Sequence, residues 1–415
     1  MSKLGKKEPR MDTDEHGCDF LEKLLDGAEV EWVALGEVAT FLKGKSLPKK
    51  SIVEEGVHKC IHYGELFTYY PAIIKDVKSR TSQSITDSIV SLSNDVLMPT
   101  SDVTPTGLAV ASCIREDNIV LGGDILVIRS SAIDGRFLST FIRNNKSKIM
   151  QMVKGATVYH IYAKDLAKLS IPIPCPENPE KSLAIQAEIV RILDTFTELT
   201  TELTTELTDR KKQYNYYRDQ LLTFEDGDVE WKELGNVTEI NTGQKPSEIL
   251  ESATDFDYIN AGTSRSGYSA NSNCEGDIVT TPSRGQGGIG YVGYQKEPFW
   301  LGALCYKMKS KDKDFLINKY LYYFLQSKSE LLLGLKKEGG VPAVNKTDLA
   351  KLQIPVPSPS EQARIVAILD KFDTLTHSIS EGLPREIEQR QKQYEYYRDL
   401  LLSFPKPEAQ MEKVA

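Results

Sequence analysis

The chain contains one sequence unit written twice. A stretch that begins at Val30, VEWVALGEVATFLKG, returns from Val229 as VEWKELGNVTEINTG. A second stretch, DLAKLSIPIP from Asp165, returns from Asp348 as DLAKLQIPVP, and a third pair consists of RKKQYNYYRDQLLTF and RQKQYEYYRDLLLSF. Such a repeat constrains the fold more than any local pattern, because both copies must build the same frame. We therefore expect two structurally related halves.

The inserts between the shared motifs hardly resemble each other. One insert begins at Gly64 and the other at Tyr258. Two binding domains that share one scaffold but recognise different targets would show this combination of a common frame and unlike inserts. The formal net charge of −8 argues against phosphate binding by the chain as a whole, but cations crowd the stretches 129–164 and 307–346. Solvated faces of surface helices would explain this crowding equally well.

Composition limits the class of protein. The 415 residues are 27% charged and 40% hydrophobic, which suits two or three domains with cores of their own. No apolar run approaches the 18 or more residues of a membrane span, and the start of the chain lacks an apolar signal core, so we expect a cytoplasmic protein with no membrane partner. The six cysteines form no Cys-x-x-Cys pair and no cluster with histidine. We expect reduced thiols and no metal site.

Two long helices are predicted beside the inserts. Apolar residues between Ile185 and Leu203 are spaced by 4, 3, 4, 3 and 4 positions, which is the seam of a coiled coil. A similar pattern begins at Ile365 and is expected to break near Gly382 and Pro384. The alternating prolines in IPIPCPENPE and IPVPSPSE force extended backbone, so each should lead from an insert into a helix. We predict that the two helices pair antiparallel.

A short repeat lies inside the first of these helices. The segment from Thr197 to Thr208 spells TELTTELTTELT, with Leu199, Leu203 and Leu207 one period apart. A period of four is close to the 3.6 residues of a helical turn, and the step from Leu203 to Leu207 is a stutter in the seam. We predict that the length of this segment sets the distance between the two halves. The alternative is a repeat of the coding sequence that has no structural consequence.

These motifs resemble the specificity (S) subunits of type I restriction–modification enzymes, particularly those of the type IC kind. The resemblance covers nearly the whole chain and is strongest in LEKLLDG, IPIPCPENPEKSLAIQAEIVRILD, AILDKFDTLT, EGLPREIE and the two QYxYYRD motifs. The repeat Thr-Glu-Leu-Thr lies where members of this family carry a short repeat of variable copy number. Its form differs from the alanine-containing version of the family, which slightly weakens its helix propensity.

The resemblance implies a fold and a set of partners. The implied fold is α/β (α+β), with two globular target recognition domains separated by two antiparallel coiled-coil helices. The partners would be double-stranded DNA, two methyltransferase (M) subunits and restriction (R) subunits held through them. We expect no cofactor in this chain, with S-adenosylmethionine, ATP and Mg²⁺ in the partners. The predicted divisions are an N-terminal segment 1–29, recognition domains 30–165 and 229–347, a central spacer 166–228 and a C-terminal spacer and tail 348–415.

Motifs of catalysis are missing from the sequence. It has no Asn-Pro-Pro-aromatic methyltransferase motif, no Walker loop and no nuclease pattern. GQGGIG from Gly285 satisfies Gly-x-Gly-x-x-Gly, but YVGYQ follows it and reads as a strand rather than the helix of a nucleotide site. A tight turn, or a hairpin that lets backbone amides approach a phosphate, fits better. We predict a non-catalytic subunit; the alternatives are a tandem DNA-binding adaptor and a methyltransferase.

Candidate DNA-reading residues follow from their chemistry. Direct readout needs paired donors and acceptors on loops or helix faces that reach the major groove. In the first insert the candidates are Thr100, Ser101, Asp102, Thr104, Lys154, Thr157, Tyr159 and His160. In the second they are Asn260, Thr263, Ser264, Arg265, Tyr268, Ser283, Arg284 and Gln286. The two arginines are the strongest, because no other arginine lies between Val229 and Thr347 and arginine to guanine is the commonest specific contact.

Phosphate contacts are predicted separately. Arg143, Lys146 and Lys337 follow apolar helical patterns and would fix the register on DNA without reading bases. For each of these cations, and for each polar loop residue, an ordinary solvated surface is the alternative.

Overall fold

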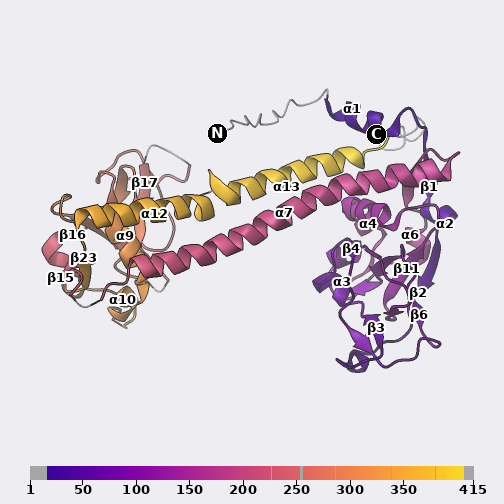
Figure 1. Cartoon of the computed structure of the whole chain (residues 1–415), viewed down its shortest axis with the longest axis horizontal. Coiled ribbons are helices and arrows are strands. Elements are labelled where there is room, and N and C mark those ends of the chain that lie inside the picture. The colour runs from indigo at the N-terminus through magenta and orange to yellow at the C-terminus, as the bar shows by residue number, and fades with distance from the viewer. Residues whose placement is uncertain are drawn as a thin grey trace. The chain divides into compact units, whose positions relative to one another are not determined.

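The computed structural model describes residues 16–225, 227–252, 256–285, 287–337, 339–378 and 380–405 (Figure 1). The chain is mixed α/β and forms two compact units. Unit 1 consists of residues 1–201 and 389–415, and unit 2 of residues 202–388. The boundary therefore falls inside the long helix α7, Pro179–Leu221. The first fifteen residues of the predicted N-terminal segment lie outside the described part.

The repeated motifs build the same frame in each unit. In unit 1, β1 (Val30–Ala34) pairs antiparallel with β14 (Ser170–Pro174) and continues into α2 (Leu35–Val38). In unit 2, β15 (Glu230–Glu233) pairs in the same way with β23 (Gln353–Val356) and continues into α8 (Leu234–Val237). Because β1 and β15 come from the VEW motif and β14 and β23 follow the DLAKL motif, the two repeated motifs are partners of each other.

A close approach of backbone explains one repeated glycine. A Cβ added at Gly36 would lie 2.9 Å from the Cβ of Ala167, and one added at Gly235 would lie 2.8 Å from the Cβ of Ala350. Both glycines come from LGxV and both alanines from DLAKL. A side chain at either glycine would separate the two motifs, so the sequence repeat preserves a contact.

Unit 1 carries two main sheets. The five-stranded sheet has the order β2-β11-β7-β9-β4 and the four-stranded sheet the order β5-β3-β10-β6. The strands of the first are Thr40–Lys43, Ile125–Arg129, Val96–Pro99, Ser112–Ile114 and Ile73–Ile74. Those of the second are Arg80–Thr81, His58–Ile61, Val120–Leu121 and Ile89–Val90. The helices are α1 (His16–Leu25), α3 (Glu65–Thr68), α4 (Gly135–Asn144), α5 (Lys146–Met152) and α6 (Ala163–Leu166), with short 3-10 turns at Lys49–Ser51 and Pro105–Ala109.

Unit 2 is built on a related plan. Its four-stranded sheet has the order β16-β22-β19-β20, and a three-stranded sheet has the order β18-β17-β21. The strands are Thr238–Thr242, Cys305–Ser310, Ile278–Pro282 and Gly293–Gln295, then Gly267–Ser269, Phe256–Ile259 and Phe299–Leu301. The helices are α9 (Asn318–Ser327), α10 (Ser329–Gly334), α11 (Lys346–Ala350) and α12 (Pro359–His377). β20 lies in the YVGYQ stretch that the sequence predicted as a strand.

Equivalent buried glutamines attach the long helices to their units. The Oε1 of Gln186 in α7 accepts a hydrogen bond of 2.9 Å from the backbone N–H of Asp134, just before α4. The Oε1 of Gln362 in α12 accepts one of 2.8 Å from the N–H of Ile317, just before α9. Both glutamines are fully buried. Each satisfies a backbone donor at a helix start that would otherwise be left unpaired.

The long helices contact each other through aromatic rings within each unit. In unit 1, Phe196 of α7 stacks on Tyr397 of α13 (Gly382–Leu401), with ring centroids 5.1 Å apart. In unit 2, Tyr217 of α7 stacks on Phe372 of α12 at 5.7 Å. The predicted break is present, because α12 ends at His377 and α13 begins at Gly382, whose φ is +76° (Figure 1).

The tetrapeptide lies within uninterrupted helix, as Figure 1 shows for α7. Its threonines are satisfied by the helix itself: the hydroxyl of Thr201 donates to the carbonyl of Thr197 at 2.8 Å, and that of Thr208 to the carbonyl of Thr204 at 3.0 Å. Leu199, which the sequence placed in a buried seam, is 40% exposed. The described helices include none long and apolar enough to cross a membrane.

Candidate nucleic-acid interface

Two predicted DNA-reading segments of the first insert lie side by side. β8 (Ser101–Asp102), β13 (Tyr159–His160) and β12 (Lys154–Gly155) form a three-stranded sheet in the order β12-β13-β8. His160 pairs with Ser101 on one side and with Lys154 on the other. We call these three strands and the residues 156–158 between them the unit 1 ridge. The sequence could identify the two segments by residue type but not their pairing.

The backbone of Thr100 ties the unit 1 ridge to the rest of the unit. Its N–H donates to the carbonyl of Asp124 at 2.8 Å, and its own carbonyl accepts from the N–H of Ile161 at 3.1 Å. β8 directly follows β7, so the ridge continues a strand of the five-stranded sheet. The ridge is therefore mounted on a buried element.

Asp102 and Thr104 shape the loop after β8. The Oδ1 of Asp102 accepts from the backbone N–H of Val103 and its Oδ2 from the hydroxyl of Thr104, each at 2.7 Å. This closed turn leaves Val103 strongly exposed at its tip. The two predicted readers thus have a structural role within the chain, whereas Thr157 is exposed on the opposite loop of the ridge.

The corresponding region of unit 2 has the same pairing. Ala343 forms antiparallel bridges with both Arg284 and Lys337. The N–H of Lys337 donates to the carbonyl of Ala343 at 2.9 Å, and the N–H of Gly285 to the carbonyl of Pro342 at 3.1 Å. We call residues 283–285, 336–337 and 339–344 the unit 2 ridge. It places the predicted reader Arg284 and the predicted phosphate contact Lys337 on opposite sides of Ala343.

A lysine–aspartate ion pair lies beside each ridge. The Nζ of Lys154 is 2.7 Å from the Oδ2 of Asp165, and the Nζ of Lys337 is 2.7 Å from the Oδ2 of Asp348. In both cases the lysine hydrogen bond holds the pKa of the aspartate below its usual range. Each ammonium keeps further N–H donors, so DNA readout by Lys154 and phosphate binding by Lys337 stay predictions.

The two arginines predicted to read DNA have different surroundings in the structure. Arg284 is exposed, and no hydrogen bond or ion pair joins its guanidinium to another residue in the described ranges. Arg265 lies between β17 and β18, where its Nη1 is 2.8 Å from the Oδ1 of Asp257 and its guanidinium is 4.2 Å from the ring centroid of Tyr268. The hydrogen bond to Asp257 raises the pKa of Arg265. Of these two arginines, only Arg284 has a guanidinium that no described side chain holds.

Other residues predicted in the second insert differ in accessibility. Thr263 and Ser264 are exposed in the loop that carries Arg265. The Oδ1 of Asn260 accepts from the N–H of Leu304 at 2.9 Å and so serves the fold. Ser283 is 5% exposed, which is inconsistent with the predicted base contact, because it lies where β19 enters the unit 2 ridge. Gln286 lies outside the described residues.

The two predicted phosphate contacts of unit 1, Arg143 and Lys146, also differ in exposure. Arg143 donates inward from α4: its Nε is 2.5 Å from the carbonyl of Ala111, and its Nη2 is 3.2 Å from the hydroxyl of Ser112. Burial lowers the pKa of this guanidinium. This engagement is inconsistent with a phosphate contact, since the donors face the interior. Lys146, the first residue of α5, is exposed.

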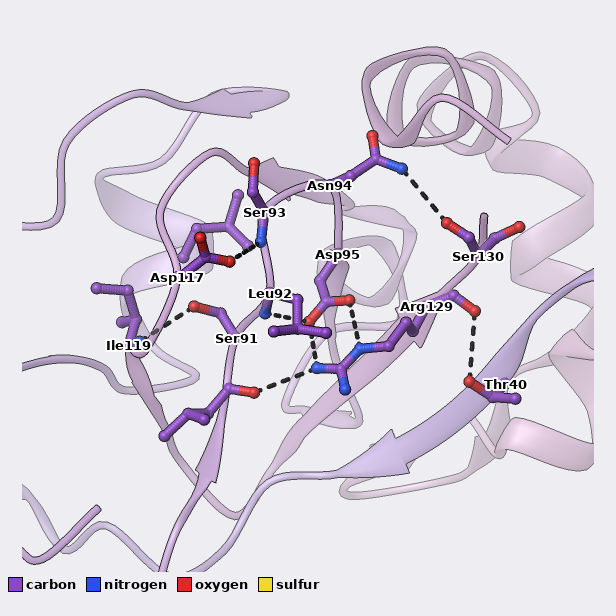
Figure 2. Close-up of polar contacts among 12 residues, drawn as sticks. Thr40, Ser91, Leu92, Ser93, Asn94, Asp95, Asp117, Ile119, Arg129 and Ser130 are labelled. Carbon is purple, nitrogen blue, oxygen red and sulfur yellow. Dashed lines mark hydrogen bonds and ion pairs between the residues drawn. The ribbon is translucent and has the colours of Figure 1, made fainter. Parts of the chain in front are cut away.

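An ion pair that the sequence analysis did not predict lies at the start of the strand that leads into the unit 1 ridge. Arg129 of β11 donates from Nε to Oδ1 of Asp95 at 2.8 Å and from Nη2 to Oδ2 at 2.7 Å, and Nη2 also reaches the carbonyl of Val90 at 3.2 Å (Figure 2). Asp95 is 1% exposed and directly precedes β7. The pair thus fixes the start of the strand whose other end leads into the unit 1 ridge.

The described residues contain no group of three or more His, Cys, Asp or Glu side chains that could hold a metal ion. Five buried cysteines form no disulfide: Cys60, Cys113, Cys175, Cys274 and Cys305. Burial raises the pKa of Cys60 to about 11 and that of Cys113 to about 12, so these thiols stay protonated and unreactive at neutral pH.

Comparison with known proteins gives one result for both halves. The family model described as "Type I restriction modification DNA specificity domain" matches residues 28–210 and again residues 227–389. The EcoR124I/EcoR124II specificity subunit of Escherichia coli is 37% identical over 414 residues, which cover 94% of this chain and 98% of that subunit. The EcoprrI specificity subunit of E. coli is 30% identical over 391 residues, with coverage of 87% and 92%.

Solved structures resemble the fold at lower identity. The S subunit of a type I restriction–modification system from M. genitalium superposes with a TM-score of 0.58 and 18% identity, covering 92% of this chain and 98% of that one. A chain from a structure concerned with complex assembly and conformational transition of the type I system gives a TM-score of 0.57 and 18% identity, with coverage of 90% and 97%. At this identity the likeness is evidence of a shared fold.

Proposed function

The chain belongs to the family of type I restriction–modification specificity subunits, and from that premise we propose how its parts divide the recognition of DNA. Its role is that of the DNA-specificity subunit of a type I restriction–modification system. The observation that carries the proposal is the match of one specificity-domain family to each half of the chain. Each unit then reads one half of a bipartite DNA target, and the unlike inserts read unlike sequences.

The long helices set the spacing between the two half-sites. In this proposal α7 pairs antiparallel with α12 and α13 as a coiled coil, for which the ring stacks Phe196–Tyr397 and Tyr217–Phe372 are the support. The exposure of the tetrapeptide also supports it, because a segment with few buried side chains can change in length without loss of a core.

One tetrapeptide corresponds to one base pair. Four helical residues advance by about 6 Å and rotate by about 40° beyond a full turn, close to the roughly 35° twist of one base pair of about 3.4 Å. Rotation must match as well as reach, so helix tilt absorbs the excess length. Deletion of Thr205–Thr208 should leave both half-sites unchanged and shorten the spacer by one base pair. If the spacer in the mapped methylation sites were unchanged, the correspondence of one tetrapeptide to one base pair would be wrong.

The repeated QYxYYRD motifs dock methyltransferase subunits. The two motifs have the same local geometry: Arg218 is 2.8 Å from Asp219, and Arg398 is 2.8 Å from Asp399. Two alike surfaces suggest two M subunits for each S subunit, with R subunits attached through them. Methyl transfer and ATP-driven cleavage, with S-adenosylmethionine, ATP and Mg²⁺, then belong to the partners. A mass of the reconstituted methyltransferase with one M for each S would contradict the stoichiometry.

A single experiment tests the function as a whole. Cells that carry the complete system, and cells in which this gene is deleted, are compared by methylome sequencing. The proposal expects one bipartite methylated sequence that is lost with the gene. An unchanged methylome, with no methyltransferase subunit co-purifying with the chain, would favour the stand-alone DNA-binding adaptor. Crosslinking of S-adenosylmethionine to the purified chain would favour the methyltransferase.

A further inference from the structure

The two ridges share a set of equivalent positions. A displacement of 183 positions relates Asp165 to Asp348, since 348 − 165 = 183. The same displacement relates Lys154 to Lys337, and both lysines contact those aspartates at 2.7 Å. This equivalence arises from the frame, although the inserts themselves hardly resemble each other in sequence.

The paired strands keep the same displacement. His160 pairs with Ser101 and Lys154, and Ala343 pairs with Arg284 and Lys337. Ser101 therefore occupies in unit 1 the place that Arg284 occupies in unit 2, since 284 − 101 = 183. His160 and Ala343 are the neighbours of these two residues across the ridge.

One exposed apolar residue is common to both ridges. Val158 is 44% exposed and its counterpart Val341 is 64% exposed. The recurrence of this exposed valine at the same place on two unlike inserts, rather than its exposure alone, favours a surface that becomes covered, because burial of apolar surface is favourable. An apolar side chain on a DNA-reading element can pack against the apolar sugar edge of a groove.

The ridges share the lysine and the valine and differ at most other positions. At the two positions that pair directly across the strands, Ser101 and His160 in unit 1 are replaced by Arg284 and Ala343 in unit 2. A hydroxyl beside an imidazole offers short-range donors and acceptors. An arginine beside an alanine offers a long fork of donors with free space next to it, which is the geometry that matches the O6 and N7 of guanine.

We infer that the two ridges enter the major groove in the same way and that the positions 101/284 and 160/343 select the base pair that each unit reads. The ion-paired lysines and the exposed valines are common supports that contact backbone and groove wall without choosing a sequence. Arg284 then reads a guanine in the second half-site. This inference rests on the proposed function and adds to it which positions of the fold carry specificity.

The test transplants the pair of residues from one ridge to the other. The double variant S101R/H160A is reconstituted with the methyltransferase subunit, and its methylated sites are mapped on a DNA library. We expect a guanine preference of roughly 5- to 150-fold to arise at one position of the first half-site, the range of one bidentate arginine contact. The second half-site should not change. The control S82R adds the same charge at an exposed serine outside the ridge and should leave both half-sites unchanged.

The reciprocal variant R284S/A343H protects the test against a graft that fails to fold, because Arg284 is exposed and has no described polar partner to lose. It should abolish one guanine preference in the second half-site alone. A variant that folds and keeps the wild-type preference at every position, or a control that changes it as much, would overturn the inference. In that case the wild-type complex would still methylate a bipartite site, so the proposed function would survive.

Discussion

Arg284 and Arg265 differ in whether another side chain already holds the guanidinium, and this difference predicts different effects of their removal on DNA recognition. Residue type ranks the two arginines together, but Arg265 is joined to Asp257 and lies over Tyr268, whereas Arg284 has no such partner among the described residues. We expect Arg284→Ala to remove about 1 to 3 kcal/mol of discrimination at one base pair, which is a factor of about 5 to 150. The stability of unit 2 should not change, since no described polar contact is lost.

Arg265→Ala should behave in the opposite way. Its ion pair is solvent-exposed, so its removal has a small effect on stability, and the loop between β17 and β18 loses its fixed conformation. Because the guanidinium is already held by a carboxylate and a ring, we expect base preference to stay within about twofold of the wild type, with weaker binding to all sequences alike.

The assay measures methylation rates on duplexes that carry every single-base change in the second half-site, at one fixed salt concentration, because phosphate binding depends steeply on salt. Lys296→Ala is the control, since it removes an exposed cation from the same unit without touching either arginine. If Arg265→Ala relaxed the base preference as strongly as Arg284→Ala, the reasoning from occupied donors would be refuted.

Three further predictions concern the frame. Asp95→Ala should lower the free energy of unfolding by about 2 to 3 kcal/mol in urea titrations, below the cost of breaking a fully buried pair, because the Arg129 side chain keeps 31% exposure. Gln186→Ala should cost about 1 to 3 kcal/mol, since it leaves the N–H of Asp134 unpaired, and an unchanged urea midpoint would contradict this. Burial raises the pKa of Cys113 to about 12. The contribution of this thiol to the free energy of unfolding is therefore complete below its unfolded pKa near 9 and is lost as the pH rises from there towards 12. The free energy of unfolding of a Cys113→Ala variant should fall less steeply over that interval.

Much of the architecture was determined by the sequence alone. The repeat predicted two related frames, and both are present with the same strand pairing. The heptad spacing and the proline-rich entries predicted a long helix, and the glycine at position 382 marked the break between α12 and α13. These features are local or repeated, so their physical cause, whether helix period, proline geometry or a recurring contact, can be read along the chain.

The identity of the accessible side chains was decided only by the tertiary structure. Arg143 and Ser283 have the residue types of DNA contacts, yet one donates to carbonyls of its own unit and the other is buried at a strand end. Lys154 and Arg265 are held by carboxylates 11 and 8 positions away. Hydrogen-bond partners and burial depend on which segments the fold brings together, and a hydroxyl or guanidinium has the same composition whether it faces water or the interior. Sequence therefore determined the frame, while the tertiary contacts decided which of the candidate side chains stay exposed and which are engaged within the chain.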